Sequence, residues 1–452
     1  MKLVKMSLAA AVLLGASAFA LDNVKVNGDA KVYYNTSNLD QVTPATDSMF
    51  GKDNSAADTA LRLGVTGDLL KGVSFGVTGY AVSTLGLENN LVANTWTSGH
   101  TNGVEDNSWI SELWLAGTMG KTTAKLGRME LDTPLAFSEK WSVAANTFDA
   151  AVLINQDLPD TTLVAAWVGK GNGVNHLAPL AGVGAVVAAK DNGSAVGLDG
   201  YMAAGAKYTT FGEAGAYAVA AVNNSFKPLT AQAWYYNVSS VADAYWLQAD
   251  INCELVKGVK IGAQYAHIDP KGVVDNVTND VLGEGKAKNS DAYAFKLGYE
   301  GVQNLKVSVA YSDVDEDGVL NIANTATNNL VAGQSKLYTE AWWNYGYVGA
   351  PGATSWNVTA EYDAGFAKLG TYYTNVSIDN TGNAIVPTLR TLGASRADNT
   401  NMTEVAVTAS KSFGPLDATL AYISTDADDQ NTNVNADGSR YDSVQAYLTL
   451  NF

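Results

Sequence analysis

The chain has 452 residues and a formal net charge of −17, and only 16% of its residues are charged, against roughly 25% in average soluble domains. A chain this acidic argues against nucleic acid as a partner, because phosphate binding requires a basic surface. Cys253 is the only cysteine, so no intrachain disulfide can form. A secreted fold of this length must therefore be stabilised without disulfides.

Residues 1–20 have the three parts of a secretory signal peptide. Two lysines precede an apolar run that ends at Leu14, and the small residues Ala18 and Ala20 follow it. The run is shorter than the about 20 apolar residues that a membrane-spanning helix needs, which argues against a membrane anchor. We expect export, and a single domain over residues 21–452.

The mature chain opens with a period of two. Between residues 24 and 35, apolar side chains such as Val26 and Val32 alternate with polar ones such as Lys25 and Lys31. This is the pattern of a strand with one apolar and one polar face. The pattern recurs to the end of the sequence and predicts about 18 strands, within about 16 to 18. They are expected near residues 24–35, 59–67, 73–82, 108–117, 122–129, 147–155, 161–169, 214–223, 229–238, 244–254, 259–268, 291–299, 305–313, 355–363, 366–376, 402–412, 417–425 and 440–452.

The connections between these strands are short and long in turn. Short ones include 67–72 and 300–304, and long ones include 130–146 and 314–354. A soluble β-sandwich also alternates apolar and polar faces, and a parallel β-helix would need a short fixed repeat that is missing. The loop pattern and the export signal favour an all-β fold, a transmembrane antiparallel β-barrel with short periplasmic turns and long extracellular loops.

Several stretches resemble a known family. These are MKLVKMSL at the start, AKLGRMELDTPLAF (124–137), NTFDAAVLINQDLPDTTLVAAWVGK (146–170) and the closing YLTLNF. They resemble the major outer-membrane porins of epsilonproteobacteria and, more loosely, the wider Opr family of porins. The resemblance implies a trimeric porin of about 18 strands, with the third long loop folded into the lumen. Porins of this family can carry calcium in or near the lumen.

The segment 130–146 is the third long connection, and its charges make it the candidate constriction. An ordinary outer loop is the alternative. Opposite charges should come from inward-facing strand positions, because a pore selects between solutes at its narrowest point, where charged side chains are close together and few water molecules fit. The candidate constriction residues are Glu130, Asp132, Glu139 and Lys140 on the loop and Lys25, Lys31, Arg62, Glu112, Lys125 and Arg128 on the strands.

Arg128 is a conflict within this set, because it shares the outward parity of Leu126 if Lys125 points inward. A charge facing lipid at mid-depth costs about 2–4 kcal/mol. We therefore expect either a bulge at Gly127 or a position beyond the hydrocarbon edge.

Asp313, Asp315, Asp317 and Gly318 match the first half of a calcium-binding loop. The position of the bidentate glutamate is Asn324, which excludes a full EF-hand. A looser divalent-cation site, with Ca²⁺ as the ion, is a hypothesis, and a solvated acidic loop is the alternative.

The segment that ends at Phe452 alternates up to that residue, with Leu448 and Leu450 on its apolar face. In a closed barrel it must pair with the first strand, because lipid tolerates no unpaired sheet edge. The resemblance implies that these three residues form the signal read by the outer-membrane assembly machinery.

Together these observations predict a porin for passive diffusion of ions and small hydrophilic solutes, with a preference for cations because the chain is acidic. The expected partners are outer-membrane lipid and lipopolysaccharide, and two further copies of the chain. A substrate-selective channel is one alternative, and a structural or adhesin barrel acting through its loops is another. An enzyme is not expected, since the sequence has three histidines but no G-x-S-x-G nucleophile motif.

Overall fold

The structure is a computed structural model, and it describes residues 21–38, 49–83, 85–87, 91–92, 94–95, 107–141, 143–172, 208–210, 214–276, 287–324, 333–379, 400–428 and 440–452. The predicted signal peptide, residues 1–20, lies outside the described residues. Within the described part, one sheet of 20 strands closes on itself, and its eighteen long strands pair antiparallel.

Two of these strands, β4 (Asn94–Thr95) and β9 (Thr209–Thr210), have two residues each. The other eighteen form the barrel, as predicted. They are β1 (Asp22–Ser37), β2 (Ser55–Leu70), β3 (Val73–Ser83), β5 (Asn107–Met119), β6 (Thr122–Met129), β7 (Phe148–Asn155), β8 (Thr161–Gly171), β10 (Ala216–Asn223), β11 (Leu229–Val238), β12 (Ala242–Asn252), β13 (Val259–Pro270), β14 (Ser290–Tyr299), β15 (Leu305–Val314), β16 (Ala353–Asp363), β17 (Lys368–Ile378), β18 (Thr400–Phe413), β19 (Leu416–Ala427) and β20 (Arg440–Asn451).

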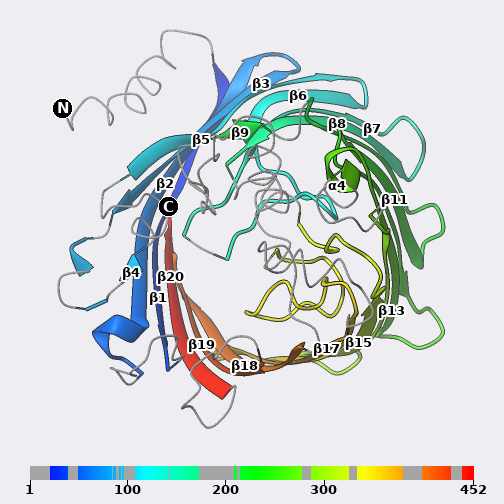
Figure 1. The fold of residues 1–452 in the computed structure, drawn as a ribbon. Helices are drawn as coiled ribbons and strands as arrows, with labels where there is room; N and C mark the ends of the chain where they lie inside the picture. The colour runs from blue at the N-terminus through cyan, green and yellow to red at the C-terminus, as the bar shows by residue number, and fades with distance from the viewer. Residues whose placement is uncertain are drawn as a thin grey trace.

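Each long strand pairs antiparallel with the next in the chain, and β20 pairs with β1. The register of this closing pair places Val32 opposite Leu448 and Ala30 opposite Leu450. Figure 1 shows the strands as a continuous ring, with blue β1 beside red β20. The pairing therefore leaves no free edge among the long strands, which is the arrangement that a β-structure needs in lipid.

Alternation along the strands sorts side chains between the two faces of the barrel. In β12, Tyr245 and Leu247 are 45% and 48% exposed on the outer face, whereas Trp246 between them is fully buried on the inner face. The same order holds in β20, where Leu448 and Leu450 are exposed outward. The period of two read from the sequence thus gives the correct face in both strands.

The outer face has a band of aliphatic side chains and a row of aromatic rings toward the long-connection ends of the strands. Tyr235 packs against Tyr245, and Tyr311 packs against Tyr293 and Trp356, with ring centroids 4.8–6.4 Å apart. Aromatic side chains at the border of an apolar band are typical of barrels that sit in a bilayer.

Two short helical elements have their bounds in the described residues, η1 (Lys52–Asn54) and α4 (Val273–Asn276). Among the residues described, no helix has both the length and the apolar character required to cross a membrane.

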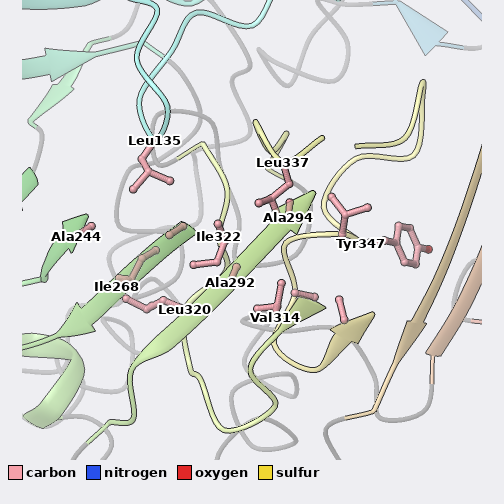
Figure 2. Close-up of a cluster of buried hydrophobic side chains, with 14 of the residues drawn as sticks. Leu135, Ala244, Ile268, Ala292, Ala294, Val314, Leu320, Ile322, Leu337 and Tyr347 are labelled. Atoms are coloured by element: carbon pink, nitrogen blue, oxygen red, sulfur yellow. The ribbon is translucent and has the colours of Figure 1, made fainter. Parts of the chain in front are cut away.

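Two connecting segments fold against the inner face of the sheet. We name residues 130–141 with 143–146 the first lumen segment, and residues 315–324 with 333–352 the second lumen segment. In Figure 1 their cyan and yellow traces lie inside the ring. Figure 2 shows the apolar cluster that fixes them, in which Leu135, Ile322 and Leu337 from the segments meet small inward side chains of the wall, among them Ala292 and Ala294.

Candidate functional site in the lumen

The first lumen segment is built as a small hairpin. Asp132 and Phe137 form an antiparallel bridge, and the amide of Ser138 donates to the carbonyl of Leu131 at 2.8 Å. Inside this hairpin the Thr133 hydroxyl donates to the carbonyl of Ala136 at 2.7 Å. The turn directs the buried side chain of Leu135 into the apolar cluster of the lumen. The Thr-Pro sequence thus produces the rigid turn that its residue types favour.

The two lumen segments are held to each other by polar contacts. The Asn324 side chain accepts from the amide of Phe137 at 3.0 Å and donates to the carbonyl of the same residue at 2.9 Å. Lys336 pairs with Asp132 at 2.9 Å. The two hydrogen bonds between the Asn324 side chain and the backbone of Phe137 hold the two segments together.

A group of charged side chains lies where the first lumen segment meets β1 and β2. Arg62 pairs with Asp29 at 2.5 Å, and Lys140 pairs with Glu130 at 2.5 Å. The Glu130 carboxylate is also within electrostatic reach of the wall residues Lys31, Arg62 and Lys125. Acidic side chains of the segment and basic side chains of the wall therefore lie close together here.

The remaining candidates take different places. Lys125 points inward, 4.1 Å from the centre of the Trp114 ring, and lies near Glu112. Lys25 is exposed near the opposite end of β1, where it pairs with Thr66. Lys25 is therefore separated along β1 from the charged group that includes Asp29 and Lys31.

Glu139 does not face the basic wall. It is 9% exposed, and its carboxylate accepts from the indole N–H of Trp141 at 2.9 Å and from the Asn324 amide at 3.0 Å. Buried charged groups are found with hydrogen-bonding partners of this kind because desolvation is costly. Glu139 is thus part of the support of the segment rather than an acid that faces the channel.

A cavity of about 300 Å³ opens beside this charged group. Lys31 contributes from β1, Lys140 and Trp141 from the first lumen segment, and Trp342 and Tyr345 from the second. Tyr447 and Thr449 of β20 complete its lining. Two lysine ammonium groups and four aromatic rings can interact with a solute by charge and by stacking.

Arg128 does not lie with the other predicted constriction residues. The pairing of β6 with β5 and β7 is continuous through Gly127, so there is no bulge at that residue and Arg128 keeps the outward parity of Leu126, which is 64% exposed. Arg128 lies at the long-connection end of its strand, where Asp149 binds it in two contacts of 2.7 and 3.2 Å. The assignment of Arg128 to the pore constriction was therefore wrong: the residue belongs to the outer rim.

Other contacts of the rim keep Arg128 in this position. The guanidinium carbon lies 3.4 Å from the centre of the Tyr208 ring, and one N–H donates to the carbonyl of Ile110 at 2.9 Å. Burial raises the pKa of Tyr208 to about 12, so the ring remains neutral beside the cation. Gly127 has a φ of 127°, and a Cβ there would collide with the carbonyl oxygen of Leu113.

The three aspartates proposed as a calcium site do not converge. Asp313 is in β15, where its carboxylate accepts from the Thr354 hydroxyl at 2.9 Å. Asp317 pairs with Lys288 at 2.7 Å, and Asp315 accepts from the amide of Asp317 at 3.2 Å. No group of three His, Cys, Asp or Glu side chains able to hold a metal ion occurs in the described part of the chain. The structure thus gives no support to calcium at these residues.

His267 is the one histidine of the three that lies in the described residues. It is on the outer face of β13, with Nδ1 2.9 Å from the Asp291 carboxylate and the Tyr245 ring 5.9 Å away. This side chain is therefore placed in the aromatic row of the outer surface and not beside the lumen cavity.

Sequence reasoning missed two glutamates that support the lumen. Glu404 of β18 is 1% exposed and accepts backbone N–H groups of the second lumen segment. Glu340 of that segment accepts from the amide of Ala341 at 2.9 Å, and burial raises the pKa of Glu340 to about 8. The sequence does contain one indication of this role. Glu404 alternates with the apolar outward residues of a strand that has few charges, which places its side chain on the inner face.

Comparison with known proteins gives structural matches alone. No family model matches the sequence, and no curated protein matches it. Solved structures of Pseudomonas aeruginosa proteins are similar in fold. OccK8 (OprE) aligns with a TM-score of 0.65 and 12% identity over 95% of this chain and 98% of that one. OccD3 (OpdP) aligns with a TM-score of 0.65 and 14% identity over 96% and 92% of the two chains.

A third similar structure is that of OpdK with vanillate, with a TM-score of 0.63 and 12% identity over 95% of this chain and 98% of that chain. Another structure of OpdK is described as that of an outer membrane protein. At these identities the likeness shows a shared barrel fold over nearly the whole chain. Function has to be argued from the residues of the site.

Proposed function

We propose that this protein is an outer-membrane porin, a water-filled channel for passive diffusion of ions and small hydrophilic solutes. The observation that supports this most directly is the charged cavity around Lys31 and Lys140 inside a closed barrel. An eighteen-stranded barrel is wider than small barrels whose interiors fill with side chains. An apolar outer band around a polar interior is the arrangement of membrane channels.

A swelling assay tests this function. Purified protein would be placed in liposomes that contain an impermeant polymer, and the liposomes would be diluted into an isotonic sugar solution. We expect a monosaccharide to enter faster than in protein-free liposomes and a large oligosaccharide to be excluded. Identical rates with and without folded protein would overturn the proposal.

A preference for cations is part of the proposal. Its support is the net charge of −17, because an acidic protein attracts cations to its surface and its channel. The ion pairs Arg62–Asp29 and Lys140–Glu130 neutralise much of the charge at the cavity itself. We therefore propose that the preference is modest.

A substrate-selective channel is the second candidate. The cavity favours it, since two lysines and four aromatic side chains form a more specific surface than free diffusion requires. OpdK, which has a similar fold, was crystallised with vanillate. Block of the ion current by micromolar to millimolar amounts of an aromatic acid would distinguish selective binding from unselective passage.

We further propose that the chain is exported by its signal peptide, inserted by the barrel assembly machinery, and surrounded by lipid and lipopolysaccharide as a homotrimer. The outward aliphatic band and the aromatic row above it support a bilayer location. We propose no catalytic role and no cofactor. A structural or adhesin barrel, the remaining alternative, would bind cells or surfaces without conducting ions. Membership of the epsilonproteobacterial porins stays a prediction.

A further inference from the structure

We infer that Glu404 is a positioning residue for the proposed channel. Its buried carboxylate holds residues 341–345 of the second lumen segment in place, and through them it sets the width of the lumen cavity. This inference rests on the proposed function for its effect on transport. The position of the segment can be tested independently of transport.

Glu404 projects from the inner face of β18 and is 1% exposed. Its Oε1 accepts from the amides of Trp342 at 2.8 Å and Trp343 at 3.1 Å. Its Oε2 accepts from the amide of Asn344 at 2.8 Å and from the side-chain amide of the same residue at 2.7 Å. Four donors from three consecutive residues thus converge on one carboxylate.

Three consecutive backbone N–H groups that point to one anion form a concave anion-binding turn. In most cases such a turn binds a phosphate or a free carboxylate, but here the wall of the barrel supplies the anion as a side chain. Hydrogen bonds from N–H groups to a charged acceptor are shorter and stronger than those between neutral groups. The Glu404 carboxylate is therefore the acceptor that fixes the turn.

Asn344 extends this attachment to the neighbouring strands. Its side-chain amide donates to the hydroxyl of Thr425 in β19 at 2.8 Å, and its carbonyl oxygen accepts from the hydroxyl of Tyr441 in β20 at 2.9 Å. The turn is thus bound to three adjacent strands, β18, β19 and β20. Glu404 is the wall residue whose carboxylate accepts from the backbone of the turn.

The residues fixed in this way line the channel. Trp342 and Tyr345 belong to the lining of the cavity that contains Lys31 and Lys140. Trp343 lies between them in the sequence and packs against Trp141 of the first lumen segment, with ring centroids 5.7 Å apart. Movement of the turn would therefore move one aromatic side of the cavity and release a contact with the first lumen segment.

The test is the variant Glu404→Gln, which has nearly the same shape but no charge, and which presents an NH₂ group to donors. Glu361→Gln is the matched control. Glu361 also lies on the inner face, in β16, but it is exposed and its carboxylate accepts from the Tyr372 hydroxyl. Both variants remove one negative charge from the lumen, and Glu404→Gln alone removes the support of the turn.

In planar bilayers we expect Glu404→Gln to show a larger conductance, frequent current fluctuations, and passage of polyethylene glycols that the wild type excludes. We expect Glu361→Gln to keep the size limit of the wild type. An unchanged size limit and unchanged fluctuations in folded Glu404→Gln would overturn the inference. The folded state can be checked by the mobility of the unheated barrel in a denaturing gel.

Asn344→Ala provides a second test, since it removes the other half of the same contact. We expect Asn344→Ala to raise the conductance and the size limit, as Glu404→Gln does. The double variant should change them little further, because the effects of substitutions within one contact are not additive. Fully additive effects would contradict a shared role.

Limited proteolysis separates this inference from the proposed function. Cleavage within residues 333–352 reports the position of the segment in a folded barrel that need not conduct. We expect faster cleavage in Glu404→Gln than in the wild type and in Glu361→Gln. Equal cleavage rates would overturn the positioning role, whereas a wild type without conductance would overturn the porin proposal alone.

Discussion

Gly28 and Phe452 exchange both of their backbone hydrogen bonds across the closing pair of strands, with N–O distances of 2.8 and 3.0 Å. The Phe452 ring lies over Gly28, so closely that a Cβ on this glycine would be 2.6 Å from the ring. The seam between β20 and β1 therefore depends on the absence of a side chain at residue 28 and on the aromatic ring at residue 452.

We predict that Gly28→Val and Phe452→Ala both lower the amount of assembled barrel in the outer membrane while export continues. The valine would collide with the ring and with the carbonyl oxygen of Arg62 in β2, and the alanine would remove the contact of the ring with β1. Quantitative immunoblots of heated and unheated membrane samples measure the folded fraction. Wild-type amounts of folded barrel in both variants would contradict a role of Phe452, with Leu450 and Leu448, as an assembly signal.

Arg128 and Lys31 give a matched pair of charge removals on opposite faces of the wall. We predict that Lys31→Gln changes single-channel conductance because Lys31 lines the lumen cavity. Arg128→Gln should leave the conductance unchanged, since its guanidinium is bound to Asp149 on the outer rim. An altered conductance in Arg128→Gln, with none in Lys31→Gln, would contradict the outward register of β6.

Selectivity is tested by the reversal potential under a salt gradient. We expect the wild type to favour cations, and Lys31→Gln to increase that preference because it removes a positive charge from the cavity. A unit charge at 4 Å is worth about 1 kcal/mol in water, which is about fivefold for a cation and about fivefold in the opposite direction for an anion. The cation-to-anion permeability ratio should therefore rise by no more than about thirtyfold. The effect should shrink at high salt because of screening. An anion-selective wild type would show that the acids do not govern the lumen.

Glu340 predicts a dependence on pH. Burial raises its pKa from 4.5 to about 8 in the folded protein, with smaller contributions from the nearby carboxylates of Glu404 and Glu139. The folded form therefore binds the proton more tightly than a released segment would. Its contribution to the attachment of the second lumen segment is complete below pH 4.5 and is lost as the pH rises to about 8.

We accordingly expect more current fluctuation and faster cleavage within residues 333–352 at pH 9 than at pH 5. Glu340→Gln should be nearly independent of pH over this interval, because it stays neutral. The same rise in cleavage with pH in Glu340→Gln would show that another group is responsible.

The strands could be predicted because each alternates between an apolar outer and a polar or small inner face. Residues 244–254 show the reason: Tyr245 and Leu247 contact the outside, while Trp246 is buried inside. All eighteen long strands were found in this way, and their ends differ by a few residues where pairing continues beyond the alternating part, as in β1 (Asp22–Ser37).

The second lumen segment could not be predicted, because its apolar residues follow no period. Val319, Ile322 and Leu337 are buried in one cluster with Ala292 and Ala294, the small inward residues of the wall. Small inward residues of this kind look neutral in a sequence. They become informative once the register places them on the same part of the inner face.

The places of single charges also depend on register. The spacing of Asp313, Asp315 and Asp317 suggests a calcium loop, but β15 continues to Val314 and turns Asp313 toward Thr354. For Arg128 the sequence revealed the conflict of parity, and it could not reveal that Asp149 of the next strand would be its partner.

Single-channel conductance of the purified, folded protein in a planar bilayer tests the central claim most directly. A continuous aqueous path through the barrel predicts discrete current steps that increase in proportion to voltage and to salt concentration. The absence of any open state that conducts ions, in protein shown to be folded and inserted, would contradict it.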